Sequence, residues 1–384
     1  MLQESLNSAT GVISKIYSPD VDEDEIYKLF KPLFNLFNLE GIDVILKKTR
    51  CGIYHLTFQI FSAFFFFAIV VTNVIHEIYL MTIITEPRWF KIIASHNLIQ
   101  VLGTIQALML YRKRKALRKV IEHLRSTLRL IKPIMKLKKL KIIRKCLIVA
   151  ILIMLTFHFA MSQILAGKDL VFLKAKQLPL ELAFNLNISW ETTKLLVRFA
   201  SLSRQMNFIW MDSFLLYYCL LCCVLKSAFE KFRMILLEGK ERSKYLHIHN
   251  SLTEAVLVVD DAYSSQIFFC CALQLISIFL QVFLMNNVSH DGIFFYRVFS
   301  AWISLSFVVV VICASGVGES AIKVKEIICQ MDFNASFENW SQLLFKLLMS
   351  DTQLTVWKII SIKRVTILNV LGAFFTYTVI IVAL

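Results

Sequence analysis

The sequence predicts an all-α membrane protein with seven transmembrane helices, a cytoplasmic N-terminus, an extracellular C-terminus and cytoplasmic helical extensions. Apolar residues make up 57% of the 384 residues and gather in runs, and the mean hydropathy is +0.65. Lys and Arg flank these runs, as membrane topology requires. The last twenty residues, 365–384, carry no charge and are long enough to cross the hydrocarbon core of a bilayer.

Residues 1–50 are expected to form a cytoplasmic N-terminal segment, and residues 51–384 the membrane domain. The N-terminal segment has no short apolar core with a small-residue cleavage site, so no signal peptide is expected. An acidic stretch at 20–25 precedes an amphipathic run at 26–39.

Seven apolar runs have the length of a transmembrane helix. A loop of about 35 residues is expected after the third run, and Gly316 and Gly318 are expected to end the sixth. The spans are expected at about 54–75, 92–111, 146–165, 208–225, 267–284, 294–314 and 365–384.

The segment between the second and third spans carries the strongest signal of orientation. From Arg112 to Lys145 it has fifteen Lys or Arg residues and one acidic residue, Glu122. Because translocating so many positive charges is strongly disfavoured, this segment and the N-terminus are placed in the cytoplasm. Apolar residues recur every three or four positions from Leu117 to Ile131, which predicts a basic amphipathic helix. Its place between two spans favours a helix near anionic lipid over a nucleic-acid surface.

Two further polar segments, at about 226–261 and 319–360, are expected to continue as helices into the cytoplasm, as is 112–145. On the opposite side of the membrane, two Asn-x-Ser sequons fall in predicted extracellular loops. Glycosylation is therefore expected at Asn187 and Asn287.

The chain lacks the motifs of membrane enzymes. It has no His-Glu-x-x-His, Gly-x-Ser-x-Gly or Walker loop, so neither an enzyme activity nor a cofactor is expected. Cys219, Cys222 and Cys223 share a helix face, but no His or further Cys accompanies them at a ligand spacing, so no metal site is expected. A G-protein-coupled receptor would place its N-terminus outside. A secondary transporter stays an alternative, although the chain shows no internal repeat.

The final helix resembles that of the insect gustatory receptor family, in the arthropod seven-transmembrane chemoreceptor superfamily. That family ends in Thr-Tyr, five mostly apolar residues and Gln-Phe. Here Thr376-Tyr377 and residues 378–382 are followed by Ala383-Leu384, so the closing pair differs. The predicted topology and cytoplasmic extensions also resemble the family's plan. Odorant receptors of the same superfamily share that plan but end without the Thr-Tyr pair, so they are the alternative.

The resemblance implies a subunit of a ligand-gated, non-selective cation channel in the plasma membrane, which detects a small tastant. It implies a homo- or hetero-tetramer in which the cytoplasmic extensions form an anchor and helix 365–384 lines the pore. Because Ala383-Leu384 replaces the family's pair at the gate, three outcomes are open: Leu384 gates, the subunit conducts beside a different partner, or it does not conduct. The pore and gate candidates are Asn369, Thr376, Tyr377, Ile380, Ile381 and Leu384.

The resemblance also implies a ligand pocket in the outer half of the bundle. Depth along each span places mixed polar and aromatic side chains there, which suit a small ligand. Each could instead make an interhelical hydrogen bond or serve as an interface aromatic. The candidates are His158, Trp210, Trp302, Asp212, Gln281 and Tyr296, with His158, Trp210 and Trp302 foremost, and also His96, Asn97, Gln100, Ser162 and Gln274.

Overall fold

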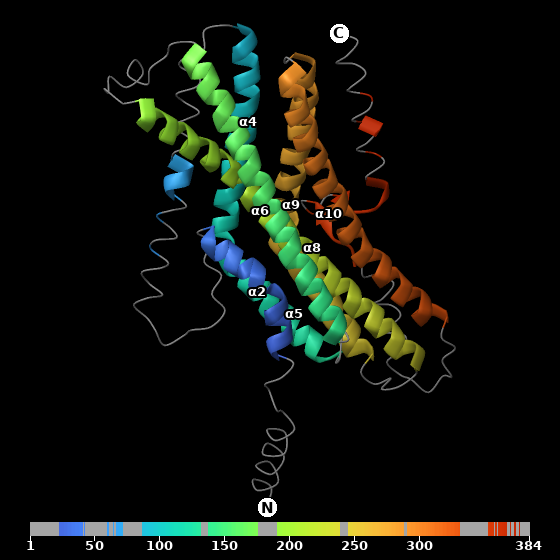
Figure 1. Cartoon of the computed structure of the whole chain (residues 1–384). Helices are drawn as coiled ribbons and strands as arrows, with labels where there is room; N and C mark the ends of the chain where they lie inside the picture. Colours follow the sequence, from blue (N-terminus) through green and yellow to red (C-terminus); the bar gives the residue numbers. More distant parts are fainter. Residues whose placement is uncertain are drawn as a thin grey trace, which may run out of the picture.

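Long helices and one small hairpin make up the described part of the chain (Figure 1). The helices are α2 (Glu23–Leu39), α4 (Pro87–Arg112), α5 (Arg114–Arg129), α6 (Leu137–Ala175), α8 (Trp190–Glu238), α9 (Tyr245–Asn287) and α10 (His290–Gln330), and the strands are β1 (Thr355–Val356) and β2 (Ile360–Ser361). The computed structural model describes residues 23–40, 42, 60, 64, 67–71, 87–131, 137–175, 190–238, 245–287, 290–330, 352–356, 358, 360–366, 369, 372, 373 and 376.

Helix α8 is the centre of the bundle. It packs against α2, α4, α6, α9 and α10, and its most apolar stretch is 83% buried, compared with 28% for α6. Trp210, Phe214 and Tyr217 of α8 are among the largest fully buried side chains. Helix α8 therefore lies inside the bundle and α6 at its edge, although both stretches are strongly apolar.

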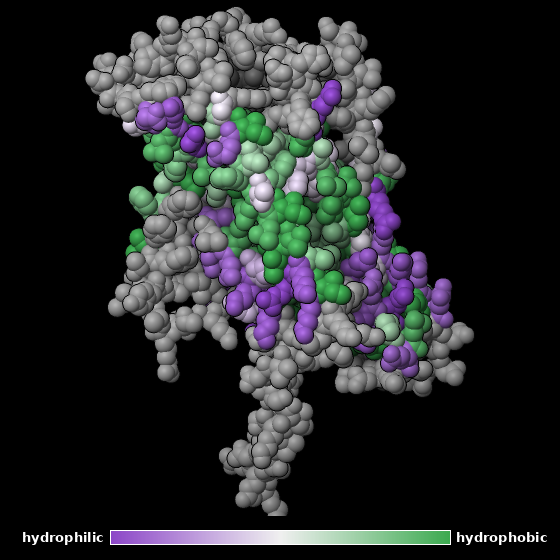
Figure 2. Space-filling model, in the orientation of Figure 1, coloured by the Kyte–Doolittle hydropathy of each residue, from purple (hydrophilic) through white to green (hydrophobic). Residues whose placement is uncertain are grey.

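Four helices are long and apolar enough to cross a membrane, counted over the described residues. The stretches are Lys141–Gly167 in α6, Lys194–Glu238 in α8, His247–Phe279 in α9 and Arg297–Gln330 in α10. Figure 2 shows a band of apolar side chains across the middle of the molecule, with hydrophilic side chains gathered below it. These observations confirm the predicted all-helical membrane class. The first and last predicted spans lie largely outside the described residues.

Helix α5 buries the apolar face that its periodicity predicts. Leu117, Val120, Ile121 and Leu124 are buried, and the helix packs against α9. The expectation of helix across 112–145 is only partly right, because α5 ends at Arg129 and α6 begins at Leu137. Pro133 in the intervening sequence disfavours a continuous helix.

Helix α10 passes through Gly316 and Gly318 without a break and continues to Gln330, which agrees with the expected helical extension from residue 319. Side chains of neighbouring segments lie against both glycines. A Cβ at Gly316 would lie 3.4 Å from Cδ of Lys226 on α8, and one at Gly318 would lie 3.5 Å from Cγ of Gln353. Small residues that let a neighbour approach are typical of helix interfaces in membranes.

The long loop expected before the fourth span is also shorter than predicted. Helix α6 extends to Ala175, and α8 begins at Trp190, well before the span predicted from about 208. Lys194, Arg198 and Arg204 lower the hydropathy of this part of α8 without preventing helix formation, since Lys and Arg are good helix formers.

The prediction of helix across 319–360 is wrong after Gln330 in the described part, because β1 and β2 form an antiparallel hairpin there. Asp260 of α9 holds this hairpin: it accepts hydrogen bonds from the backbone N of Thr355 at 2.6 Å and from Thr355 Oγ1 at 2.7 Å. Lys358, at the turn with a φ of 58°, forms an ion pair with Asp261. The hairpin is therefore fastened to α9.

An ion pair fastens the residues that follow the hairpin to α10. Nε of Arg364 lies 2.6 Å from Oε1 of Glu319, and Nη2 of Arg364 donates to Oε2 at 2.8 Å. The described residues beyond this point, among them Asn369 and Thr376, are helical. The start of the last predicted helix is thus attached to α10 at Glu319.

Candidate ligand site

One face of α8 combines polar and aromatic side chains. Gln205, Phe208 and Asp212 are spaced three and four residues apart, so they lie on the same face of the helix. This face meets α6 and α10, the two helices that pack most extensively on α8.

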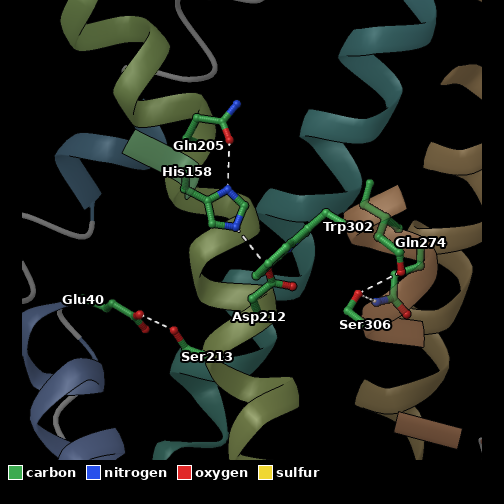
Figure 3. Close-up of polar contacts among 9 residues, drawn as sticks. Glu40, His158, Gln205, Asp212, Ser213, Gln274, Trp302 and Ser306 are labelled. Carbon is green, nitrogen blue, oxygen red and sulfur yellow. Dashed lines mark hydrogen bonds and ion pairs between the residues drawn. The ribbon is translucent and has the colours of Figure 1, made fainter. Parts of the chain in front are cut away.

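Four polar side chains join α6, α8 and α10 in what we term the His158 cluster: His158, Gln205, Asp212 and Trp302 (Figure 3). Nδ1 of His158 lies 3.1 Å from Oε1 of Gln205, and Nε2 lies 3.0 Å from Oδ2 of Asp212. The indole Nε1 of Trp302 donates to the same Oδ2 at 2.7 Å. His158, Gln205 and Asp212 are buried, and Trp302 is half-buried. The cluster places an acidic group among three helices.

Aromatic rings surround the His158 cluster. Phe157 stacks on Trp302 with ring centroids 4.6 Å apart and planes 17° from parallel. Phe299 meets Phe208 edge-on at 5.0 Å and stacks on Phe157 at 6.3 Å. Buried rings of this kind favour a flat apolar molecule or each other.

A second polar contact lies one helical turn along α10 from Trp302. Nε2 of Gln274 on α9 donates to Oγ of Ser306 at 2.7 Å (Figure 3). Ser306 also donates to the backbone carbonyl of Ile303 at 2.8 Å. This contact ties α9 to the helix that carries Trp302.

Trp210 is not part of the His158 cluster. Its Nε1 donates to the backbone carbonyl of Glu40, just after α2, at 3.2 Å, and Oγ of Ser213 donates to the carboxyl Oε1 of Glu40. Burial raises the pKa of Glu40 well above its ordinary value, although the Ser213 hydrogen bond opposes the shift. Trp210 and Ser213 therefore hold the N-terminal helix on α8.

The remaining predicted residues divide between those the structure describes and those it does not. Gln100 accepts a hydrogen bond from Nδ2 of Asn207 at 2.8 Å, and Ser162 is buried. Asn369 and Thr376 are exposed on the chain. Outside the described residues lie the side chains of Gln281, Tyr296, His96, Asn97 and Asn287, and the whole of Tyr377, Ile380, Ile381, Leu384 and Asn187.

Sequence reasoning named three members of the cluster as candidates, His158, Asp212 and Trp302, but missed Gln205. The spacing of Gln205 from Phe208 and Asp212 is the signal that identifies it. Within the described part of the chain no group of three or more His, Cys, Asp or Glu side chains is placed to hold a metal ion. The cluster offers hydrogen bonds and ring faces, which are the means of binding a small organic molecule.

Comparisons with known proteins reveal the fold. No protein-family model matches the chain, and no curated protein does. Among solved structures, the insect olfactory receptor OR5 from Machilis hrabei in complex with eugenol matches with a TM-score of 0.68 at 13% identity, over 94% of this chain and 100% of that one. A second structure of the same receptor matches with a TM-score of 0.64 at 11% identity, over 94% and 99%. Both are receptors and neither is described as an enzyme.

The match covers nearly the whole of both chains, so it concerns the complete arrangement of helices rather than one shared motif. It confirms, at the level of the fold, the resemblance that the last helix indicates. The chain has the fold of the insect olfactory receptor OR5.

Proposed function

We propose that this chain is a chemoreceptor subunit of the plasma membrane that opens a non-selective cation channel when a small molecule binds. The observation that carries the proposal is the fold, which is similar to an insect olfactory receptor over 94% of the chain. Thr376-Tyr377 favours the gustatory branch, with a tastant as ligand. The olfactory receptors among the matches keep an odorant receptor as the second candidate.

The proposed topology has seven spans, a cytoplasmic N-terminal segment at 1–50 and an extracellular C-terminus. The fifteen positive charges of 112–145 support this orientation. Epitope tags read on intact cells test it: the C-terminal tag is accessible and the N-terminal tag is not. Loss of the deglycosylation shift in the Asn187→Gln, Asn287→Gln double variant is expected, and an accessible N-terminal tag would contradict the topology.

The His158 cluster is the proposed ligand site. It lies where three helices meet, and the matched receptor solved in complex with eugenol supports a small-molecule ligand. A ligand that contacts Trp302 acts directly on α10. Displacing an interhelical hydrogen bond there changes how α10 sits on α8, because Asp212 belongs to α8.

The route from this site to the proposed pore runs along α10. Trp302 and Glu319 are seventeen residues apart on this helix, about 25 Å at 1.5 Å per residue. Glu319 pairs with Arg364 immediately before the last helix. A tilt or shift of α10 is therefore proposed to reach the start of helix 365–384 through the Glu319–Arg364 ion pair.

The exposed side chains of the last helix support the proposed tetramer and central pore. Val365, Asn369, Ala373 and Thr376 are all exposed and lie at helical spacing along one stripe. In four copies around an axis, this stripe would face the pore or the neighbouring subunit. Oγ1 of Thr376 donates to the backbone carbonyl of Gly372 at 2.9 Å, so the hydroxyl oxygen can still accept a hydrogen bond.

Whole-cell recording tests the function. Cells expressing the chain, alone or with a second receptor subunit, are expected to show a cation current when a panel of tastants and odorants is applied. His158→Ala and Trp302→Ala are expected to reduce sensitivity more than Trp210→Ala. Saturable uptake coupled to an ion gradient, without any ligand-evoked current, would replace the proposal with transport.

A further inference from the structure

We propose that the ligand is an uncharged molecule whose hydroxyl group donates a hydrogen bond to Oδ1 of Asp212. This inference rests on the proposed function, since it takes the His158 cluster as the ligand site. It adds the chemical class of the ligand and the atom that selects it.

The two carboxylate oxygens of Asp212 are used differently. Oδ2 accepts hydrogen bonds from both His158 and Trp302. Oδ1 is buried and has no hydrogen-bond partner among the described residues, although Asp212 is only 4% exposed. A buried acceptor left unpaired is costly, so an oxygen in this state calls for a partner from outside the chain.

The surroundings of Asp212 favour a neutral partner. Oδ2 of Asp212 already has two nitrogen partners, His158 and Trp302. An ammonium group would have to give up its water among the aromatic side chains around the cluster, which is costly for a charge. A hydroxyl satisfies Oδ1 without adding charge.

The carboxyl group of Glu40 does not favour a cationic ligand either. It lies on the side of α8 that faces the end of α2, and its Oε1 accepts a hydrogen bond from Ser213, the residue after Asp212. Burial raises its pKa, which favours the uncharged form. It therefore supplies no second negative charge for a cationic ligand.

The rings around Asp212 define the rest of the ligand. Phe157 and Trp302 stack, and Phe208 and Phe299 meet edge-on beside His158. Neighbours of this kind stabilise a flat or cyclic apolar body and offer it no further charge. The inferred ligand is thus a small alcohol or phenol with a hydrocarbon body.

Matched pairs of compounds test the inference on the purified full chain in lipid nanodiscs. The probes are 2-phenylethanol, 2-naphthylmethanol and cyclohexylmethanol, each with its methyl ether, and 2-phenylethylamine as the charged analogue. In the wild type, at least one alcohol is expected to bind about tenfold or more tightly than its ether, because a buried charged acceptor discriminates strongly against a ligand without a donor.

Asp212→Asn provides a result that a purely structural role would not give. His158 and Trp302 both require an oxygen at the Oδ2 position, so the amide nitrogen takes the place of Oδ1 and donates. The variant is therefore expected to lose its preference for the alcohol and to bind the ether at least as well. Glu230→Gln, an exposed carboxyl on the same helix, is the control and should keep the wild-type ranking.

Three results would overturn the inference: ethers binding as tightly as alcohols in the wild type, the amine binding most tightly, or no binding by any alcohol. Equal weakening of both members of a pair in Asp212→Asn would also overturn it. Selective binding of an alcohol without any evoked current would support this inference while removing the channel proposal, so the two failures are distinguishable.

Discussion

Replacing Trp302 by Phe removes one hydrogen-bond donor from the His158 cluster and keeps an aromatic ring against Phe157. The lost bond runs to a carboxylate over 2.7 Å. Hydrogen bonds to charged groups contribute about 1.5–3 kcal/mol, whereas interhelical hydrogen bonds in membranes average about 0.6 kcal/mol. Asp212 is buried and its other oxygen has no partner among the described residues, so we start from the range for a charged acceptor. The contribution in a membrane is smaller, because helices that have come apart in the membrane also find hydrogen-bond partners. We expect the free energy of unfolding to fall by about 1.5–2 kcal/mol.

Trp210→Phe is the matched control. It also removes an indole donor, here from α8 itself, but the acceptor is the neutral backbone carbonyl of Glu40 at 3.2 Å. A longer bond to a neutral acceptor is expected to contribute about 0.5–1 kcal/mol. Reversible unfolding by SDS in mixed micelles measures both variants on the same scale.

A double-mutant cycle isolates the contact between Trp302 and Asp212. In the Asp212→Asn background, Trp302→Phe is expected to cost about 0.5 kcal/mol, because the acceptor no longer carries a charge. Equal losses for Trp302→Phe and Trp210→Phe would refute the assignment of a buried charged acceptor at this site. A Trp302→Phe loss that is the same with and without Asp212→Asn would refute it as well.

The remaining predictions concern contacts outside the cluster. Reversing either charge of the exposed Arg364–Glu319 ion pair should lower the stability by less than about 1 kcal/mol. It should nevertheless shift the agonist concentration for half-maximal current, and reversing both charges should restore the wild-type concentration. Unchanged dose–response curves would exclude the ion pair from gating. Glu40→Gln should have the same thermal stability as the wild type near pH 4.5, the ordinary pKa of Glu, and a higher thermal stability as pH rises. The reason is that the pKa of Glu40 is raised in the folded state, so the stability of the wild type falls with pH. Parallel pH profiles would contradict this. Leu124→Asp, which buries a charge on the face of α5 against α9, should abolish surface expression, whereas Lys119→Asp on the exposed face should not; equal expression would show that this face is not packed.

The sequence predicted best where one physical signal dominates locally. The apolar face of α5 follows from a period of three and four residues, and burial of Leu117, Val120 and Leu124 matches it. The apolar runs likewise located the helices α4, α6, α8, α9 and α10, because each run is long enough to cross a bilayer. Helix ends were less accurate: α6 continues to Ala175 and α8 begins at Trp190, both outside the apolar runs that predicted these helices.

The hairpin and the complete cluster depend on contacts between distant parts of the chain. Each strand has two residues, and the Asp260 carboxylate that holds Thr355 lies 95 residues earlier in the sequence. A pattern of residues along 352–361 does not contain that partner. The composition of the spans identified His158, Asp212 and Trp302 as candidates, but only packing of α6, α8 and α10 shows that they meet and that Trp210 faces α2.

The most direct test of the central claim is the reversal potential of the ligand-evoked current, because it depends on the residues that line the pore. Asn369 lies on the exposed stripe of the last helix. The wild type is expected to pass Na⁺ and K⁺ alike, and Asn369→Asp should move the reversal potential to more positive values with external Ca²⁺, since a ring of carboxylates attracts divalent cations. A reversal potential identical in wild type, Asn369→Asp and Asn369→Lys, at matched surface expression, would show that this helix does not line the conducting pathway.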